Sequence, residues 1–412
     1  MKRFMICWLV LFCVSSAWGQ DSLNVTRVGS FDSVQLATGV ALFGSYACVI
    51  DQVHGLWVID VSNPFAPETA GRCSTFASGA GVAVDGGYCF VADDVDGLHV
   101  VNVDDPTWPV EVGYCAGAGV AYAVTVQADL AYVPSDGEGL KIIDVSDLTH
   151  PVLAGECDTP GSAWWVGVED TLAYVADNYS GLRVMDISDR AAPVEIGACN
   201  TPWSAFGLTK NGDYIYIAAG SGLVIVDVTT PAEPVVINAF EMPYVAYNVV
   251  VLNGIAFVVA NNGGLRLIDV SDPLNLIEIG HYAMSGAQAY HLAVQGSLAY
   301  VAQGEFFNIY DCSAALSASG AFTLPPSSYI LSAYPNPFNS ATTLQLDLPQ
   351  NIRARLVVYD VLGRNVATLR DGMLSAGVHN VRFDASALSS GNYFVRLDAE
   401  YVSRTQKILL VK

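Results

Sequence analysis

Aromatic side chains recur at one position along the sequence, and they are the residues best suited to hold a ligand. Flat rings beside hydrogen-bond acceptors are typical of sites that bind sugars or peptides. Two more tryptophans, Trp165 and Trp203, lie near this position and are expected to join the same surface. The recurring position holds, at intervals of about 42 residues, Tyr122, Trp164, Phe206, Tyr247 and Tyr290.

A packing role for the same rings is the alternative. The strand that carries them also places Val124 and Val166 on the same side, as a face buried against a neighbour would. Thr38 and Ala80 take the aromatic position in the first two copies. Ligand binding and packing between units are therefore both open, and binding is the hypothesis carried forward.

The carboxylates of one loop suggest a metal site, but the evidence for it is weaker than that for the aromatic site. Asp93, Asp94 and Asp96 lie in one short loop, and oxygen ligands of this kind suit a hard cation such as Ca²⁺. However, no Glu follows at the spacing that a Ca²⁺ loop needs, and the same loop suits a hairpin turn. We expect no cofactor, with Ca²⁺ as the single candidate.

One Asp ends nearly every copy of a repeated strand. A catalytic residue should occur once or twice, so we expect this Asp to cap a turn by accepting backbone N–H bonds. The sequence also lacks a nucleophile elbow, a phosphate loop and paired histidine ligands, and we expect no enzymatic activity. The repeated residues are Asp60, Asp144, Asp186, Asp227, Asp269 and Asp311, with Asn102 in one copy.

A repeat of about 42 residues positions these side chains. Each copy contains four short strand-like runs separated by turn signals, which predicts an antiparallel meander. Four strands per unit are typical of a propeller blade. In one unit the runs cover 122–127, 130–133, 140–145 and 151–155. The third run begins at Gly55, Gly97, Gly139, Gly181, Gly222 and Gly264, and a degraded seventh copy ends at Asp311.

Seven copies predict an all-β, seven-bladed propeller over residues 20–313. The seventh copy lacks a fourth strand, while residues 25–29 form an unmatched strand before the first copy. We expect 25–29 to be the outer strand of the last blade, which closes the ring and removes an open edge. The aromatic positions would then gather at one mouth of the channel, beside the acidic loops 93–96 and 136–138.

The N-terminus and the composition indicate an exported, acidic protein. Lys2 and Arg3 precede an apolar run too short to span a bilayer, so residues 1–19 are expected to be a cleaved signal peptide, leaving no transmembrane segment. The chain has 40 acidic and 18 basic residues, which argues against nucleic acid as a partner. The periodic cysteines Cys73, Cys115, Cys157 and Cys199 are expected to be small buried residues, and disulfide pairing is left open.

The C-terminal region is organised differently. Residues 314–329 are rich in Ser and Ala, which predicts a linker. Residues 330–412 contain six or seven short alternating runs, which predict a small immunoglobulin-like β-sandwich.

Both parts resemble known families. The strands written LWVIDV and LVIVDV are similar to those of the LVIVD-repeat family of bacterial propellers, a likeness that implies the fold but no activity. The C-terminal module resembles the sorting domain of proteins exported by the type IX (Por) secretion system. Its matching residues include Tyr334, Pro335, Asn336, Pro337, Phe338 and Asn339, then Gly363, Gly391 and Lys407. The resemblance implies the type IX machinery as a partner and, after Sec export to the periplasm, delivery to the cell surface or the medium.

The sequence therefore predicts a secreted or cell-surface propeller that binds a carbohydrate or a peptide, that is, an extracellular glycan or protein ligand. One alternative is an extracellular propeller hydrolase or lyase that uses channel-facing carboxylates. Another is a structural component of a surface layer.

Overall fold

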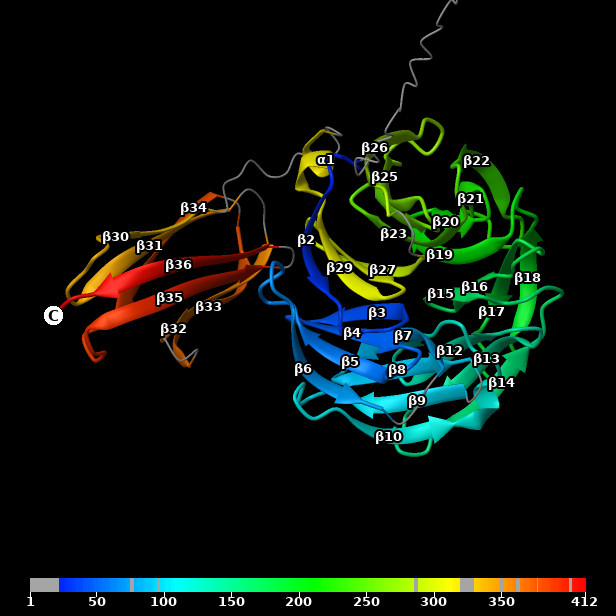
Figure 1. Cartoon of the computed structure of the whole chain (residues 1–412), viewed down its shortest axis with the longest axis horizontal. Helices are drawn as coiled ribbons and strands as arrows, with labels where there is room; N and C mark the ends of the chain where they lie inside the picture. The colour runs from blue at the N-terminus through cyan, green and yellow to red at the C-terminus, as the bar shows by residue number, and fades with distance from the viewer. Residues whose placement is uncertain are drawn as a thin grey trace, which may run out of the picture.

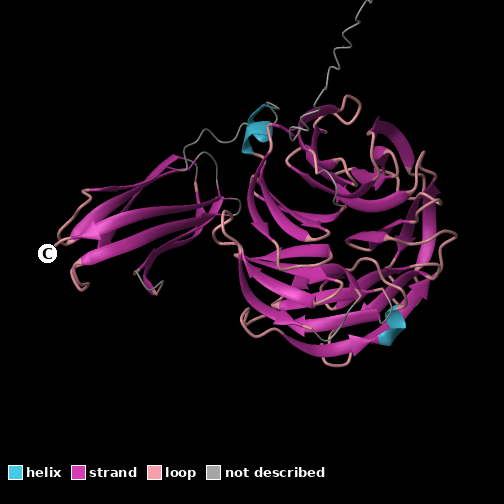
Figure 2. Cartoon of the chain, viewed as in Figure 1, coloured by secondary structure: helices cyan, strands magenta, loops and turns pink. Residues whose placement is uncertain are grey.

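The computed structural model describes residues 22–74, 78–94, 97–284, 288–318, 330–348, 352–360, 364–375, 377–399 and 402–412 (Figure 1). Strands make up most of these residues (Figure 2). The predicted signal peptide, Asp96 and Gly363 lie outside the described residues.

Seven antiparallel sheets are formed by the described residues up to 318. Sheet 1 contains β3 (Ala37–Phe43), β4 (Tyr46–Asp51), β5 (Gly55–Asp60) and β6 (Glu68–Cys73). Sheet 2 contains β7 (Gly79–Asp85), β8 (Tyr88–Asp93), β9 (Gly97–Asn102) and β10 (Val110–Cys115). Sheet 3 contains β11 (Thr125–Gln127), β12 (Leu130–Ser135), β13 (Gly139–Asp144) and β14 (Val152–Cys157). Sheet 4 contains β15 (Trp165–Glu169), β16 (Leu172–Ala176), β17 (Leu182–Asp186) and β18 (Val194–Cys199).

The last three sheets include the strands that join the two ends of the repeat array. Sheet 5 contains β19 (Ala205–Asn211), β20 (Tyr214–Ala219), β21 (Gly222–Asp227) and β22 (Val235–Glu241). Sheet 6 contains β23 (Ala246–Leu252), β24 (Ile255–Ala260), β25 (Gly264–Asp269), β26 (Ile277–Tyr282) and the short β1 (Ser22–Leu23). Sheet 7 contains β27 (Ala289–Gln295), β28 (Leu298–Gln303), β29 (Phe306–Asp311) and β2 (Thr26–Phe31).

The innermost strands of neighbouring sheets contact one another all the way round, in the order β3, β7, β11, β15, β19, β23, β27 and back to β3. Outermost strands such as β10, β14 and β18 lie at the periphery (Figure 1). Each pair of neighbouring sheets shares one buried apolar cluster; between sheets 2 and 3, for example, Phe90 and Leu98 lie in the same cluster as Val133. This arrangement explains why both faces of each strand are apolar.

The predicted pairing of the two ends of the array is confirmed. Strand β2 runs antiparallel to β29, with Thr26 opposite Asp311 and Phe31 opposite Phe307. An unpredicted detail is that β1 pairs with the outer strand β26, so that sheet 6 has five strands.

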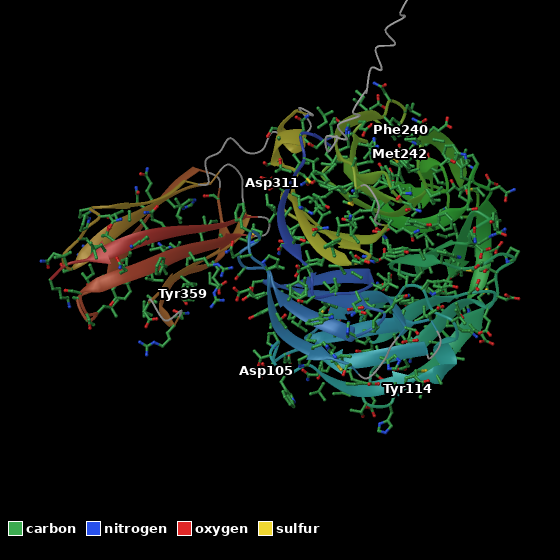
Figure 3. The ribbon with its side chains drawn as sticks, viewed as in Figure 1. Asp105, Tyr114, Phe240, Met242, Asp311 and Tyr359 are labelled. Atoms are coloured by element: carbon green, nitrogen blue, oxygen red, sulfur yellow. A yellow bond between two sulfur atoms is a disulfide. The ribbon has the colours of Figure 1, made fainter. Side chains whose placement is uncertain are left out.

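The predicted role of the repeated Asp as a turn cap is also confirmed. Each of these carboxylates accepts a hydrogen bond from the backbone N–H two residues further on, and Asn102 does the same through its amide oxygen. Asp311, labelled in Figure 3, is the member that ends β29. A residue needed by every sheet in this way is a structural residue.

Two details differ from the sequence prediction. The inner strand β11 begins at Thr125 rather than Tyr122, because residues 116–118 form a 3₁₀ turn and Ala121 makes only an isolated bridge. The predicted linker begins as helix α1 (Ser313–Ala318), whose Leu316 is buried in the cluster between sheets 6 and 7.

The described cysteines comprise one disulfide pair and free residues that are buried or half-buried. The structure joins Cys48 of β4 and Cys89 of β8 in a disulfide. Cys73 and Cys115 are buried in the clusters between sheets, as expected for small apolar residues, whereas Cys157 and Cys199 are half-buried.

The C-terminal residues form two antiparallel sheets around one apolar core. Leu344 and Val381 of the first sheet lie in this core with Leu356, Val395 and Ile408 of the second. No helix in the described ranges is long and apolar enough to cross a membrane. The first sheet contains β30 (Ile330–Tyr334), β31 (Ala341–Leu348) and β34 (Gly377–Asp384). The second contains β32 (Ile352–Tyr359), β33 (Asn365–Leu374), β35 (Gly391–Ala399) and β36 (Val402–Leu410).

A glycine on an outer strand tests the close contact between neighbouring sheets. A Cβ atom at Gly155 would overlap the backbone carbonyl oxygen of Arg190 in the next sheet, and a backbone atom has little room to move. We expect Gly155→Ala to lower the free energy of unfolding by about 2 kcal/mol, measured by chemical denaturation. Gly117→Ala is the control, because its Cβ would meet Leu153 at an ordinary 3.5 Å. Equal stabilities of the two variants would contradict the close approach.

Candidate functional site

The aromatic position coincides with an irregularity in the innermost strand. In sheets 1, 2, 5, 6 and 7 the register with the second strand shifts at this residue, so one extra residue is accommodated there. Such a bulge turns the extra side chain out of the regular alternation. The Ala before each aromatic residue, such as Ala205 or Ala246, is fully buried and fixes the strand. The bulge therefore directs the rings of Phe206, Tyr247 and Tyr290, whereas Tyr122 and Trp164 precede their strands β11 and β15.

Five rings from five successive sheets form a continuous arc, hereafter the aromatic arc. Each ring is half-buried, so part of its surface stays accessible. The centroid distances are typical of paired aromatic rings. They are 4.8 Å for Tyr122–Trp164, 4.9 Å for Trp164–Phe206, 5.4 Å for Phe206–Tyr247 and 5.8 Å for Tyr247–Tyr290.

Acidic groups lie at the Tyr122 end of the aromatic arc, as predicted. Burial, followed by repulsion from Asp136 and Asp94, raises the pKa of the Tyr122 hydroxyl. Burial and the neighbouring charges of Asp93 and Asp136 also raise the pKa of Asp94. The indole Nε1 of Trp164 donates a 3.1 Å hydrogen bond to the Ser162 hydroxyl, which in turn donates to Asp136. Hydrogen-bond acceptors thus adjoin the rings.

Trp165 and His291 meet across the centre of the ring. They belong to sheets 4 and 7, which are not neighbours, and their ring centroids are 5.0 Å apart. Burial lowers the pKa of His291 to about 4, so its imidazole is neutral at physiological pH. Its Nδ1 is enclosed and has no hydrogen-bond partner among the described residues. The two rings therefore join opposite parts of the ring of sheets directly.

The residue that follows the bulge is small in most sheets and polar in sheet 6. A Cβ at Gly207 would come within 3.2 Å of the amide nitrogen of Asn248, so the glycine makes room for this side chain. Asn248 is only 1% exposed, and neither of its side-chain polar atoms has a partner among the described residues. The centre of the ring therefore carries uncharged hydrogen-bonding groups.

The structure does not bring every predicted residue to this site. Trp203 packs against the buried cluster between sheets 4 and 5 instead of joining the aromatic arc. Asp93 ends β8, is 1% exposed and accepts the backbone N–H of Ser78, so its carboxylate serves the fold. Within the described part of the chain, no group of three or more His, Cys, Asp or Glu is placed to hold a metal ion. The Ca²⁺ hypothesis stays a prediction, since Asp96 is not described.

Sequence reasoning missed the structural role of a second set of buried carboxylates, of which it had named only Asp93, as a metal candidate. Each of them ends the second strand of its sheet or follows that strand directly: Asp51 in sheet 1, Asp93 in sheet 2 and Asp177 in sheet 4. Asp177 accepts bonds from Thr159 and Gly161 at 2.7 and 2.9 Å. Burial raises its pKa, more strongly than these bonds lower it. These buried carboxylates could have been recognised in the sequence, because an Asp ends the apolar second strand at the same repeat position in three copies.

Asp51 is the most heavily bonded of this set and is fully buried. Burial acts to raise its pKa, but hydrogen bonds, chiefly from Val53 and Gln35, outweigh burial and bring the pKa below the ordinary 3.8. The carboxylate thereby ties the loop before β3 to the hairpin after β4. Its donors are Gln35 N, Leu36 N, Val53 N, His54 Nδ1 and Trp57 Nε1, at 2.8 to 3.3 Å.

The predicted sorting motif is held against the last strand of the chain. Asn336 donates through Nδ2 to the Lys407 carbonyl at 3.0 Å and accepts from the Leu409 N–H at 2.9 Å. Phe338 is 3% exposed and forms a parallel bridge with Leu410. Tyr334 ends β30, Pro335, Pro337 and Asn339 are exposed, and Gly391 begins β35. The first residues of the sorting module are therefore hydrogen-bonded to its last strand.

Comparisons with known proteins agree with this organisation. The fold and the repeated strands define a β-propeller protein with a C-terminal export module. The LVIVD repeat model matches residues 36–75, 78–116, 118–159, 160–201, 205–241 and 245–284, more than half of the sequence. The chain belongs to the LVIVD-repeat family. The seventh copy, whose third strand is degraded, lies outside these matches.

The C-terminal module is matched independently. Residues 332–412 match the model described as the secretion system C-terminal sorting domain. The protein therefore carries a type IX sorting domain and is secreted to the cell surface or the extracellular space. No curated protein matches the chain.

Solved structures resemble the chain in fold alone. The β-propeller domain of Cps50 (Swd1) from Myceliophteria thermophila is 11% identical, with a TM-score of 0.53 over 70% of this chain and 99% of that one. The computationally designed Ika8 protein is 9% identical, with a TM-score of 0.50 over 95% of this chain and 100% of that one. PorZ of Porphyromonas gingivalis, an essential surface component of its type IX secretion system, is 11% identical, with a TM-score of 0.50 over 90% of this chain and 59% of PorZ.

Stability against acid should depend on Asp51. Because its pKa is lower in the folded state, its ionised form stabilises the fold above the ordinary pKa, and this contribution is lost as the pH falls through the folded value. Asp51→Asn should cost about 1–3 kcal/mol at neutral pH, and the difference from wild type should shrink under acid. Thermal unfolding across pH measures it, with the exposed Asp32→Asn as control. A difference that is constant with pH would contradict the assignment.

The sorting module can be tested by removal. Without residues 330–412 the chain should remain in the periplasm, because the domain matched for sorting is absent. Cell fractionation and protease accessibility on intact cells measure the location. Met373→Ala in the full chain alters an exposed residue of the same module and should leave display unchanged. Surface display of the truncated chain would refute the sorting role.

Proposed function

We propose that this protein is an extracellular binding module, which holds a carbohydrate or peptide ligand on the aromatic arc. The observation that supports it most is the contact between five half-buried rings from five sheets. The five arc rings pack on one another, whereas the equally half-buried Trp203 packs against the cluster between sheets 4 and 5. The arc residues also keep accessible surface beside the acceptors Asp94 and Asp136.

The proposal includes a finer description of the fold. The seven sheets and their closed order of contacts support a seven-bladed propeller with β2 as the outer strand of the last blade. Two sheets around one core support an immunoglobulin-like sandwich for the sorting module. A ring of this kind supplies a rigid frame for the aromatic arc, because every sheet is held on both faces.

Binding is favoured over catalysis by the state of the buried carboxylates. Asp51 and Asp177 accept several hydrogen bonds each and serve to tie loops, so neither is placed as a free acid or base. The proposal accordingly assigns no enzymatic activity and no cofactor. PorZ, which resembles this chain in fold, is described as a bacterial surface component, and this supports a role at the cell surface.

The aromatic arc can be tested with the full-length secreted protein on glycan and peptide arrays. We expect Trp164→Ala and Tyr247→Ala each to weaken the strongest interaction at least about tenfold, since each removes a contact face worth roughly 1.4 kcal/mol. Trp108→Ala is the matched control, because Trp108 is 76% exposed in a turn before an outer strand. Unchanged binding by both arc variants would refute the site.

A further inference from the structure

Sheet 7 departs from the other sheets at two positions of its third strand. Where six copies begin with Gly, β29 begins with Phe306. Where most other copies carry a long side chain at the third residue, such as Lys141, Arg183 or Arg266, β29 carries the short Asn308; Val224 in sheet 5 is also short. Both changes occur in the copy that the repeat model does not match.

In the other sheets these two positions fill the space at the end of the strand. A Cβ at Gly264 would overlap the carbonyl oxygen of Tyr282, so the chain passes directly over the glycine. The long side chains occupy the adjoining volume and are held by acidic partners. The pairs include Lys141–Glu156 at 2.5 Å, Arg266–Glu278 at 2.8 Å and Arg183–Glu195 at 3.4 Å.

A cavity of about 490 Å³ lies at this place, between sheets 6 and 7 and the start of sheet 1, lined by both Phe306 and the short Asn308. Its volume falls in the range of small-ligand sites. Its lining includes Tyr282, Tyr290, Gln303, Asn308, Tyr310 and Leu36. Tyr290 is also the last ring of the aromatic arc, so the cavity continues that surface.

The buried part of the cavity carries an organised group of polar side chains. Gln303 accepts through Oε1 from Asn308 Nδ2 at 2.9 Å and from the Tyr310 hydroxyl at 3.1 Å. The first bond orients the amide of Asn308, which is 1% exposed, and the second holds Gln303 in place. Its Oδ1 has no hydrogen-bond partner among the described residues. An enclosed oxygen without a donor is costly, so the cavity is suited to a ligand that supplies one.

The charges around the cavity indicate which ligand fits. Arg27 and Glu305 lie at the rim, are exposed and have opposite signs, while the buried lining is uncharged. A charged ligand would lose hydration without a buried partner, and an apolar ligand would leave the Asn308 oxygen unpaired. A neutral ligand with hydroxyl donors and an apolar face satisfies both the amides and the rings of Tyr282 and Tyr290.

We propose that the cavity of sheet 7 binds one neutral sugar unit of a glycan, whose neighbouring units continue along the aromatic arc. A sugar ring fits because it combines hydroxyl donors at its edge with a C–H face that stacks on an aromatic ring. The glycan's path along the arc rests on the proposed function. The cavity can be tested separately from the arc, because its polar residues Gln303, Asn308 and Tyr310 are not part of the arc.

The experiment uses the full-length protein, a glycan array and a panel of neutral monosaccharides followed by calorimetry and ligand-observed NMR. Wild type should bind at least one neutral sugar, and Asn308→Leu should weaken this binding about tenfold, because it removes the acceptor while keeping the branched shape of the side chain. Leu36→Trp, which blocks the cavity from a half-buried loop position, should have the same effect. Circular dichroism and thermal unfolding establish that each variant is folded.

Comparison with Trp164→Ala separates this inference from the proposed function. If Trp164→Ala weakens glycan binding while Asn308→Leu and Leu36→Trp do not, the aromatic arc binds the ligand and the cavity inference is overturned. If the cavity variants weaken monosaccharide binding while Trp164→Ala leaves the binding of longer glycans unchanged, the cavity is a sugar site and the arc is not. Absence of binding to every neutral sugar of the array and panel overturns the cavity proposal.

Discussion

The close approach of seven innermost strands around one axis is the constraint on which the rest of this structure depends. A Cβ at Gly81 would lie 2.7 Å from the Cα of Ala123 in the next sheet, so these strands leave no room for larger residues. The crowding explains the small residue after the bulge in most sheets. It also makes each exception, such as Trp165 or His291, a side chain that must extend into the centre of the ring.

Much of the fold could be predicted because the information repeats. Seven copies of one strand pattern fix the phase of the turn-capping Asp and of the rings at Tyr122 or Tyr290, so both were found from spacing alone. The meeting of Trp165 and His291 could not be predicted, because it depends on the diameter of the ring and joins copies that are not neighbours. The cavity depends on Asn308 and Phe306 being different from their equivalents, and a repeat pattern describes only what is common.

Polar residues in this protein fall into two groups with different physical roles. Those that recur, such as Asp144 or Asp269, satisfy backbone groups at turns that every sheet needs. Those that occur once, such as Asn248 or Asn308, sit where the other copies have a different side chain, and they retain unpaired atoms. Polar residues that occur in only one copy are therefore the places where the seven sheets are not equivalent.

The pairing of β2 with β29 has a consequence for the order of events in biogenesis. These strands are the first and last segments of the ring, with Thr26 opposite Asp311, so closure requires contacts across almost the whole propeller. Such a high contact order slows folding, because a long loop must close before its contacts stabilise it. The ring therefore cannot close until β29 has been synthesised. The sorting module follows β29 in the sequence, so the signal for export is synthesised only after the strand that closes the ring.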